Sequence, residues 1–223
     1  IGRDHKRLQE ISENCTLLGA SEVKSVLCDF AVPMDVKRIV KLYIEEGTIP
    51  FLFVHCAAQN VLGDFESVPI DRVDELFQVN TFSVLRFLSA LIPRMKRSKG
   101  HVVLISSGTA YFSPKRQGIY SATKASLERI GESLIAELEE SPLTVTIIHP
   151  GPISTPLLTD PEVLGSGVNV SDLTSQGVPA EVVAKKILKG LPKNKNILFV
   201  SISPIIVKWL AALCPWVLRF ILK

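Results

Sequence analysis

The stretch GHVVLISSGTAYFSPKRQGIYSATKASLERIGESL, residues 100–134, contains the two kinds of element that decide the fold. Its first part, residues 100–107, is a continuous apolar run, which is typical of a buried strand. Its last part begins an amphipathic helix that we expect over residues 120–140. In that helix Tyr120 precedes Lys124 by four residues, so both side chains lie on one face.

The same alternation of strand and helix extends in both directions along the chain. Four further strands are predicted, at residues 23–30, 49–58, 143–151 and 196–202. Three further helices are predicted, at residues 33–46, 70–95 and 180–189. Residues 152–179 are rich in Gly, Ser, Pro and Thr and are predicted to form a loop. This order predicts an α/β fold, a doubly wound parallel sheet with helices on both faces.

Composition narrows the classes to which the protein can belong. A chain of 223 residues with 47% hydrophobic and 21% charged residues is typical of one globular domain. The net charge is +3 and the basic residues are scattered, so we expect no nucleic-acid partner. The four cysteines have no CxxC spacing and the four histidines no ligand-like spacing, which predicts reduced thiols and no metal site. No signal peptide is visible. We expect an intracellular protein that is either cytoplasmic or peripheral on an intracellular membrane, such as the endoplasmic reticulum in a eukaryote.

Small and polar side chains follow the predicted strands at the points where each strand ends. They are Asp29, then Ala57 and Ala58, then Ser106 and Ser107, then Pro150 and Gly151. Parallel strands end at one edge of a sheet, and ligands bind at that edge. Tyr120 follows Ser107 by thirteen residues, so we expect its helix to begin just over the same edge.

These residue types fit hydride transfer between a carbonyl and an alcohol. A free tyrosine has a pKa of about 10 and is a poor acid–base catalyst at neutral pH. A lysine cation one helical turn away favours the phenolate, so Lys124 is expected to lower the pKa of Tyr120. The hydroxyl of Ser107, with Ser106 as the alternative, can hold the substrate oxygen. Taken alone, the Tyr–Lys pair also fits two ordinary residues on a helix surface.

With these residues in place, the sequence resembles the short-chain dehydrogenase/reductase family, from residue 3 to about residue 200. The family's Asn–Ser–Tyr–Lys set corresponds to Asn80, Ser107, Tyr120 and Lys124. The resemblance implies that Tyr120 is the general acid/base and that Ser107 orients the carbonyl. It also implies that Lys124 binds the nicotinamide ribose and that Asn80 holds a water in the proton relay. A polar residue inside a helix is the alternative for Asn80.

The resemblance implies a nicotinamide cofactor as well. The stretch PGPIST, residues 150–155, matches the family's Pro-Gly-x-x-x-Thr, which implies that Ile153 and Thr155 contact the carboxamide. Asp29 matches the aspartate that meets the adenine, although it could simply begin a turn. Arg3 resembles an arginine that favours the 2′-phosphate, so NADP is expected rather than NAD. A solvated residue at a helix start is the alternative for Arg3.

Two departures from the family pattern are visible. The family's Asn-Asn-Ala-Gly appears here as His55, Cys56, Ala57 and Ala58, which we expect to tune the cofactor site rather than destroy it. No glycine-rich Gly-x-x-x-Gly-x-Gly turn follows any strand, although the family cradles the pyrophosphate there. We therefore expect a chain that lacks the family's N-terminal strand or strands and exposes the edge FLFV, residues 51–54. The alternative function is a catalytically impaired dinucleotide-fold protein that acts as a binding partner.

The chain is expected to divide into an oxidoreductase domain, residues 1–202, and an amphipathic segment, residues 203–223. The segment's apolar face comprises Ile206, Trp209, Leu210, Leu213, Val217, Phe220 and Ile221, and its basic residues lie opposite. Its longest apolar run is too short to span a bilayer, and its pattern suits a helix at a membrane interface. Packing against the substrate lobe or a dimer mate is the alternative. Membrane contact would suit a lipophilic carbonyl or alcohol of steroid, retinoid or fatty-chain type, and a homodimer is the family's habit.

Overall fold

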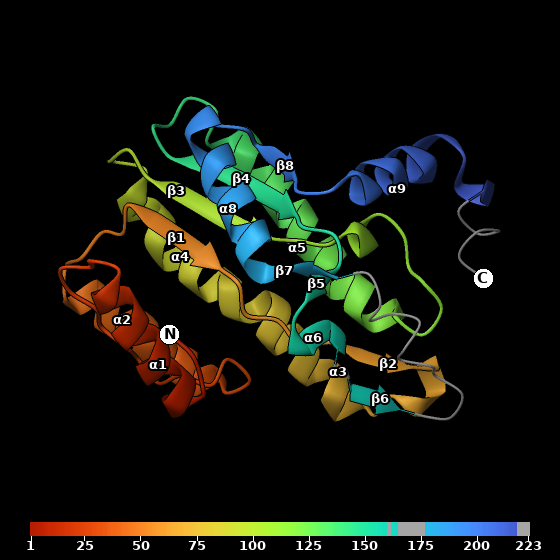
Figure 1. Ribbon diagram of the computed structural model, residues 1–223, viewed down its shortest axis with the longest axis horizontal. Coiled ribbons are helices and arrows are strands. Elements are labelled where there is room, and N and C mark those ends of the chain that lie inside the picture. Colours follow the sequence, from red (N-terminus) through yellow and green to blue (C-terminus); the bar gives the residue numbers. More distant parts are fainter. Residues whose placement is uncertain (160–161, 165–176, 218–223) are drawn as a thin grey trace.

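The computed structural model describes residues 1–159, 162–164 and 177–217 and places a parallel sheet at the centre of the molecule (Figure 1). The sheet has four strands in the order β1-β3-β4-β8. They are β1 (Leu52–His55), β3 (His101–Ile105), β4 (Thr144–His149) and β8 (Ile197–Phe199). All three neighbouring pairs run parallel, so the predicted doubly wound α/β class is confirmed.

The remaining elements surround this sheet. The helices are α1 (His5–Leu17), α2 (Pro33–Glu45), α3 (Ile70–Phe77), α4 (Ser83–Met95), α5 (Gly118–Glu137), α6 (Pro156–Thr159), α8 (Ala180–Gly190) and α9 (Ile202–Leu213). Two short parallel pairs lie outside the sheet. They are β2 (Val61–Gly63) with β6 (Glu162–Leu164), and β5 (Ile153–Ser154) with β7 (Val178–Pro179). The last three of these strands and α6 lie within residues 152–179, which were predicted as a loop; residues 160–161 and 165–176 of that stretch lie outside the described residues.

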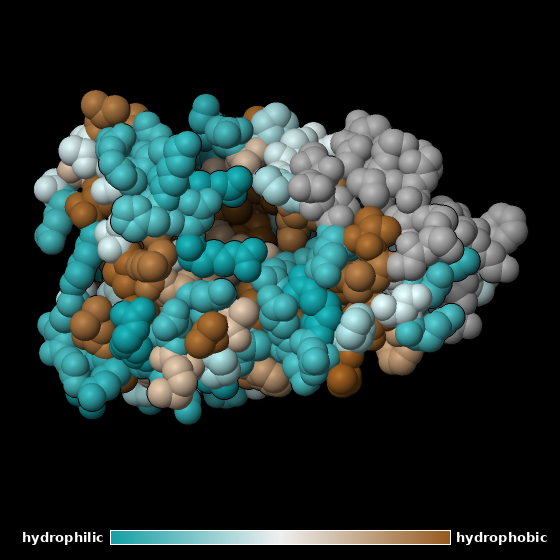
Figure 2. Space-filling view, turned by 90° about the horizontal axis from the view of Figure 1, so that it is seen from below, coloured by the Kyte–Doolittle hydropathy of each residue, from teal (hydrophilic) through white to brown (hydrophobic). Residues whose placement is uncertain are grey.

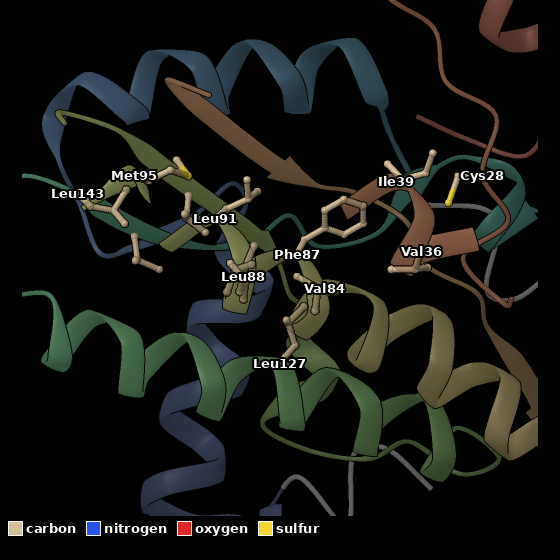
Figure 3. Packing of buried hydrophobic residues seen from close by; sticks show 13 residues of the cluster. Cys28, Val36, Ile39, Val84, Phe87, Leu88, Leu91, Met95, Leu127 and Leu143 are labelled. Carbon is tan, nitrogen blue, oxygen red and sulfur yellow. The ribbon is translucent and has the colours of Figure 1, made fainter. Parts of the chain in front are cut away.

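Both faces of the sheet are covered, because successive residues of a strand point to opposite faces. In β3, Val102 and Leu104 belong to the hydrophobic cluster formed with α4 and α5. Between them, Val103 belongs to the cluster formed with α8 on the opposite face. Figure 3 shows Phe87 and Leu88 of α4 among the side chains of the first cluster. The continuous apolar run of the sequence therefore reflects burial on both faces.

The helix predicted over residues 70–95 is continuous but changes its pitch in the middle. Between α3 and α4, residues Gln78–Phe82 form a π turn, in which each N–H reaches one residue further back. By length and composition alone this helix could also cross a membrane. However, 56% of its most apolar window is buried inside the molecule, as expected for a helix that packs against the sheet.

The strand predicted at residues 23–30 is wrong. Leu27 forms only an isolated parallel bridge with Gly2, and this bridge is not part of the four-stranded sheet. A strand needs a neighbouring strand, and the only pairing partner of β1 among the described residues is β3, although the Phe30 ring contacts His55 of β1. Within the described residues β1 is an edge strand, and Phe51 and Val54 are 74% and 43% exposed. The exposed edge that the sequence predicted over residues 51–54 is therefore present.

Helix α9 lies at one end of the molecule (Figure 1). It exposes several apolar side chains. The exposed side chains are Ile205, Ile206, Trp209 and Leu213, followed by Trp216 beyond the helix. Lys208 points toward the protein instead, with its ammonium 5.3 Å from the ring centre of Tyr111. The sequence pattern placed the apolar and basic residues on opposite faces, and in the structure Lys208 is half-buried on the face that contacts the protein.

Candidate active site

Ser107 lies just beyond the carboxyl end of β3, at the edge where the sequence predicted a ligand site. Its side chain caps a short 3₁₀ turn, Gly108–Ala110, and accepts a hydrogen bond from the Thr109 amide at 3.2 Å. The hydroxyl of Thr109 donates a second bond to the same oxygen at 3.0 Å. Because both bonds are accepted by Oγ, the hydroxyl proton of Ser107 is left to be donated elsewhere.

Tyr120 lies in the first turn of α5 and is buried beside Ser107. Burial raises the pKa of Tyr120 to about 12, and a hydrogen-bonding interaction with Ser107 opposes that shift. The structure therefore brings Ser107 and Tyr120 together as the sequence predicted. At neutral pH the phenol of Tyr120 is protonated.

Lys124 follows one turn later on the same face of α5 and is also buried. Its ammonium donates a hydrogen bond to the carbonyl of Ile105 at 3.0 Å and lies 5.8 Å from the ring centre of Tyr120. Burial lowers the pKa of Lys124 to about 8, while Cys56 acts in the opposite direction. Lys124 is thus mostly a cation at pH 7. The expected lowering of the Tyr120 pKa is not seen, because burial of the phenol outweighs the opposing interaction with Ser107.

Asn80 is fully buried in the π turn and joins two segments that are far apart in sequence. Its side-chain oxygen accepts from the Gln59 amide at 2.8 Å, and its side-chain nitrogen donates to the Gln59 carbonyl at 2.9 Å. The same nitrogen donates to the hydroxyl of Thr123 at 3.0 Å. Asn80 therefore clamps the loop after β1 to α5, next to Tyr120 and Lys124. The role in a proton relay remains a prediction.

A hollow of about 690 Å³ opens beside the end of β1. Four residues predicted to bind the cofactor line it, and they are Arg3, Asp29, Ala57 and Ala58. Figure 2 shows a hollow with a hydrophobic floor and a hydrophilic rim on the face seen from below. Asp29 also begins a turn, because its carboxylate accepts from the Ala31 amide at 2.9 Å. The two interpretations of Asp29 are therefore compatible.

The predicted nicotinamide residues follow β4. Gly151 has a φ of 76°, a left-handed conformation that favours glycine and turns the chain away from the sheet. Ile153 then enters β5 and packs against the apolar cluster under α8, and the Thr155 amide donates to the Ile153 carbonyl at 2.8 Å. The stretch that begins at Pro150 is thus a folded corner at the same edge of the sheet.

These residues fit the two ends of a nicotinamide dinucleotide. Small side chains and Arg3 line the hollow. Tyr120 and Lys124 are buried outside its lining, and Lys124 interacts electrostatically with Cys56, which lines it. Among the described residues, no glycine-rich turn follows a strand of the central sheet, so these residues do not supply the cradle for the pyrophosphate.

Two contributors to this site were not predicted from the sequence. Thr109 fixes the oxygen of Ser107, and Gln59 is the partner of Asn80. A hydroxyl residue two positions after a strand-end serine is a usable signal, since such residues often form local turns. The contact between Gln59 and Asn80 joins residues 21 positions apart, and no local pattern indicates it.

The sequence of this chain is similar to a protein-family model and to individual known proteins. Residues 1–162 match the family model described as short chain dehydrogenase. An uncharacterized oxidoreductase of Staphylococcus epidermidis is 26% identical over 92% of this chain and 85% of its own length. The 11-beta-hydroxysteroid dehydrogenase-like 4A of Arabidopsis thaliana is 27% identical over 96% of this chain and 71% of its own length.

Solved structures show the same fold. A short-chain dehydrogenase from Sphingobium yanoikuyae in complex with NADPH has a TM-score of 0.78 at 21% identity, over 88% of this chain and 75% of the other. A short-chain dehydrogenase/reductase from Burkholderia phymatum in complex with NAD has a TM-score of 0.79 at 19% identity, over 93% and 80%. At these identities the likeness concerns the fold alone.

Proposed function

Because this chain belongs to the short-chain dehydrogenase family, a family of oxidoreductases, we propose that it interconverts a ketone or aldehyde with an alcohol and uses NADP. In this proposal the substrate is lipophilic, of steroid, retinoid or fatty-chain type. Residues 1–202 form the oxidoreductase unit, and residues 203–223 contact the surface of an intracellular membrane.

One observation carries the catalytic part of this proposal. Ser107, Tyr120 and Lys124 come from two elements, and they meet at the edge of the sheet where the strands end. Tyr120 and Lys124 are both buried, and burying a polar or charged group costs free energy of folding. Burial of both groups at one point is therefore more readily explained by a function than by stability. A buried phenol next to a serine hydroxyl and a cation suits proton transfer to and from a substrate oxygen.

The proposed mechanism gives each side chain one task. The Ser107 hydroxyl donates a hydrogen bond to the substrate oxygen and so holds that oxygen beside the phenol of Tyr120. Tyr120, which is protonated at neutral pH, gives its proton to a carbonyl oxygen during reduction. In the oxidative direction the phenolate takes the alcohol proton, and the Lys124 cation stabilises that phenolate. When bound, the nicotinamide supplies or accepts the hydride.

The preference for NADP rests on Arg3. Its guanidinium lines the hollow together with Asp29, and a guanidinium suits a phosphate better than a bare hydroxyl. Solved structures of this fold hold NADPH in one case and NAD in another, so the fold itself favours neither. The proposal therefore predicts tighter binding of NADPH than of NADH.

The lipophilic substrate and the membrane contact rest on two independent supports. Relatives of this chain include proteins described as 11-beta-hydroxysteroid dehydrogenase-like. The exposed apolar side chains of Trp209, Leu213 and Trp216 form a surface that suits the interface between water and lipid. A membrane-bound enzyme can take a lipophilic substrate directly from the bilayer.

The second candidate function is a dinucleotide-fold protein that binds a partner without turnover. The observation that favours it is the lack of a glycine-rich turn at the strand ends of the described residues, because this turn normally holds the pyrophosphate. This candidate predicts weak cofactor binding and no dependence of any activity on Tyr120.

The experiment that separates the two functions compares the wild-type protein with Tyr120→Phe. Binding of NADPH and of NADH is followed by nicotinamide fluorescence, and turnover is measured with steroid, retinal and long-chain ketone substrates. We expect Tyr120→Phe to bind NADPH as the wild type does and to lose activity by a factor of about 10² to 10⁴. Equal activity of both proteins would contradict the assigned role, and a wild type without binding or turnover would support the second candidate.

A further inference from the structure

A buried polar cluster lies beside the backbone of Ser107 and has no part in the proposed mechanism. It consists of Tyr111, Glu128 and His149, and the last two are completely buried. The hydroxyl of Tyr111 donates to Oε1 of Glu128 at 2.9 Å and lies 3.0 Å from Nε2 of His149. The same Nε2 lies 3.2 Å from Oε2 of Glu128. Three segments meet in this cluster, since Glu128 is in α5, His149 ends β4 and Tyr111 follows the 3₁₀ turn.

A hydrogen bond connects the cluster to the backbone of Ser107. Nδ1 of His149 lies 3.1 Å from the carbonyl oxygen of Ser107. A carbonyl oxygen can only accept, so Nδ1 carries the proton and donates it. Nε2 of the same imidazole faces the Tyr111 hydroxyl and the Glu128 carboxylate.

The neighbours in this cluster shift the pKa values of Glu128 and Tyr111 in opposite directions. Burial acts to raise the pKa of Glu128, but the interactions with His149 and Tyr111 outweigh it and hold the pKa below its usual value. Burial and the neighbouring carboxylate raise the pKa of Tyr111, so its hydroxyl stays protonated and donates.

The imidazole also stacks with two aromatic rings. The centroid of the Tyr111 ring lies 5.0 Å from that of His149, and the centroid of the Phe199 ring lies 4.9 Å from it. The ammonium of Lys208, from α9, lies 5.3 Å from the centre of the Tyr111 ring and 5.8 Å from that of Phe199. His149 can therefore neither rotate nor shift without moving its neighbours.

We propose that Tyr111, Glu128 and His149 are positioning residues that fix the peptide of Ser107, and through it the direction in which the Ser107 hydroxyl faces Tyr120. This inference rests on the proposed function, in which that hydroxyl holds the substrate oxygen. A buried carboxylate–imidazole pair stabilises a fold little compared with apolar packing, because both groups must be desolvated. In this protein the pair fixes a geometry, and a small displacement of a group that orients a substrate lowers the rate of the reaction strongly.

The first test needs neither substrate nor cofactor. Labelling with carbonyl-¹³C serine and ¹⁵N glycine reports only on Ser–Gly pairs, of which the chain has two, at residues 107–108 and 166–167. We expect His149→Phe, which keeps an aromatic ring in the stack, to shift the carbonyl signal of Ser107. The control is His101→Phe, because His101 is a buried histidine that is bonded to Thr146 at the other end of the sheet. An unmoved Ser107 carbonyl in His149→Phe would overturn the proposal.

The second test is a double-mutant cycle on turnover. We expect Glu128→Gln to lower kcat about tenfold in the wild-type background and less than about twofold in a Ser107→Ala background. A role in stability alone would lower activity equally in both backgrounds, and that result would also overturn the proposal. If a variant fails to fold, Tyr111→Phe removes one hydroxyl only and takes its place in both tests.

Failure of the proposed function is distinguished by a different variant. It would appear as turnover that does not depend on Tyr120. Failure of the present inference would appear as Tyr120-dependent turnover in a protein whose Ser107 carbonyl does not respond to His149→Phe.

Discussion

His55 shows how one residue can replace a residue of the family pattern and still support the site. It ends β1, and its Nε2 lies 3.2 Å from the hydroxyl of Ser83. Because that hydroxyl donates to the Val79 carbonyl, it accepts from the imidazole, and β1 is thereby tied to the helix behind it. Burial, and then the Lys124 cation, lower the pKa of His55 to about 3. The imidazole is therefore neutral throughout the physiological range.

This pKa makes stability depend on pH. An unfolded histidine has a pKa of about 6.5, so between pH 6.5 and pH 3 the unfolded state binds more protons than the folded state. The contribution of His55 is complete above pH 6.5 and is lost as the pH falls. We expect the free energy of unfolding in urea to fall by about 2 kcal/mol more in the wild type than in His55→Asn between pH 6.5 and 4.5.

The control for this experiment is His5→Asn, since His5 is exposed at the start of α1. It should lose stability with falling pH as steeply as the wild type. Parallel pH profiles of the wild type and His55→Asn would show that His55 does not carry the effect.

At the scale of elements, the contact between α5 and β4 decides where the proposed catalytic side chains lie. Gly131 is buried on the inner face of α5, and a Cβ atom added there would lie 2.7 Å from the side chain of Ile147. A glycine at this point allows the helix to approach the sheet closely. The approach brings Tyr120 and Lys124 of the same helix over the end of β3.

Substituting this glycine should therefore cause overpacking. We expect Gly131→Ala to lower the free energy of unfolding by about 1–3 kcal/mol. Ile147→Val removes the terminal methyl group that the new Cβ would meet, so the double variant should recover part of the loss. Gly118→Ala is the matched control in the same helix, because the nearest atom to its Cβ would be 3.9 Å away. Equal stability of the wild type and Gly131→Ala would contradict the close approach.

The sequence predicted those elements whose signal is local. The apolar run of β3 and the helical periodicity of α5 were each predicted to within a few residues, and the spacing from Ser107 to Tyr120 followed from them. Helix α1 was not among the predicted helices, although a helix start was the alternative for Arg3, because most of its residues are polar and none is buried. The usable signal was Asp4, which caps the helix by accepting from the Arg7 amide at 3.1 Å.

Other features depend on contacts that no local pattern contains. Residues 23–30 have the composition of a strand, but whether a strand forms depends on a neighbour that the segment itself does not specify. In the same way, His149 and Glu128 are 21 residues apart and meet only because of how β4 lies against α5. The pKa of Tyr120 could not be predicted either, since it depends on how deeply the phenol is buried.

At the scale of the whole molecule, polar and apolar surfaces are divided unevenly. The active-site edge of the sheet is enclosed by α5 and the corner after β4, while α9 turns its apolar side chains outward. Trp209 and Trp216 are 61% and 71% exposed, and such aromatic residues favour the interface between water and lipid. Lys208 links this surface to the rings beneath it.

A membrane contact through this surface can be measured by sedimentation with liposomes. We expect the wild type to pellet with vesicles of phosphatidylcholine and phosphatidylserine. Replacing both Trp209 and Trp216 by serine should weaken binding by about tenfold or more, because each large side chain contributes roughly 1.5–3 kcal/mol when fully buried. Phe65→Ser is the control, since Phe65 is 81% exposed on another part of the surface. Equal pelleting of the double variant and the wild type would rule out this contact.

The π turn between α3 and α4 has a consequence for insertions and deletions. Such a turn holds one residue more than the α-helical turn that it replaces. Deleting one residue from it would join α3 and α4 into a regular helix, and each half would keep the face that it turns to the core. The fold would absorb the deletion, but Asn80 would turn away from Gln59 and Thr123. The extra residue is therefore needed for the contacts of Asn80 and not for the packing of the two helices. A protein with one residue fewer at this point should lack the hydrogen bonds between Asn80 and both Gln59 and Thr123.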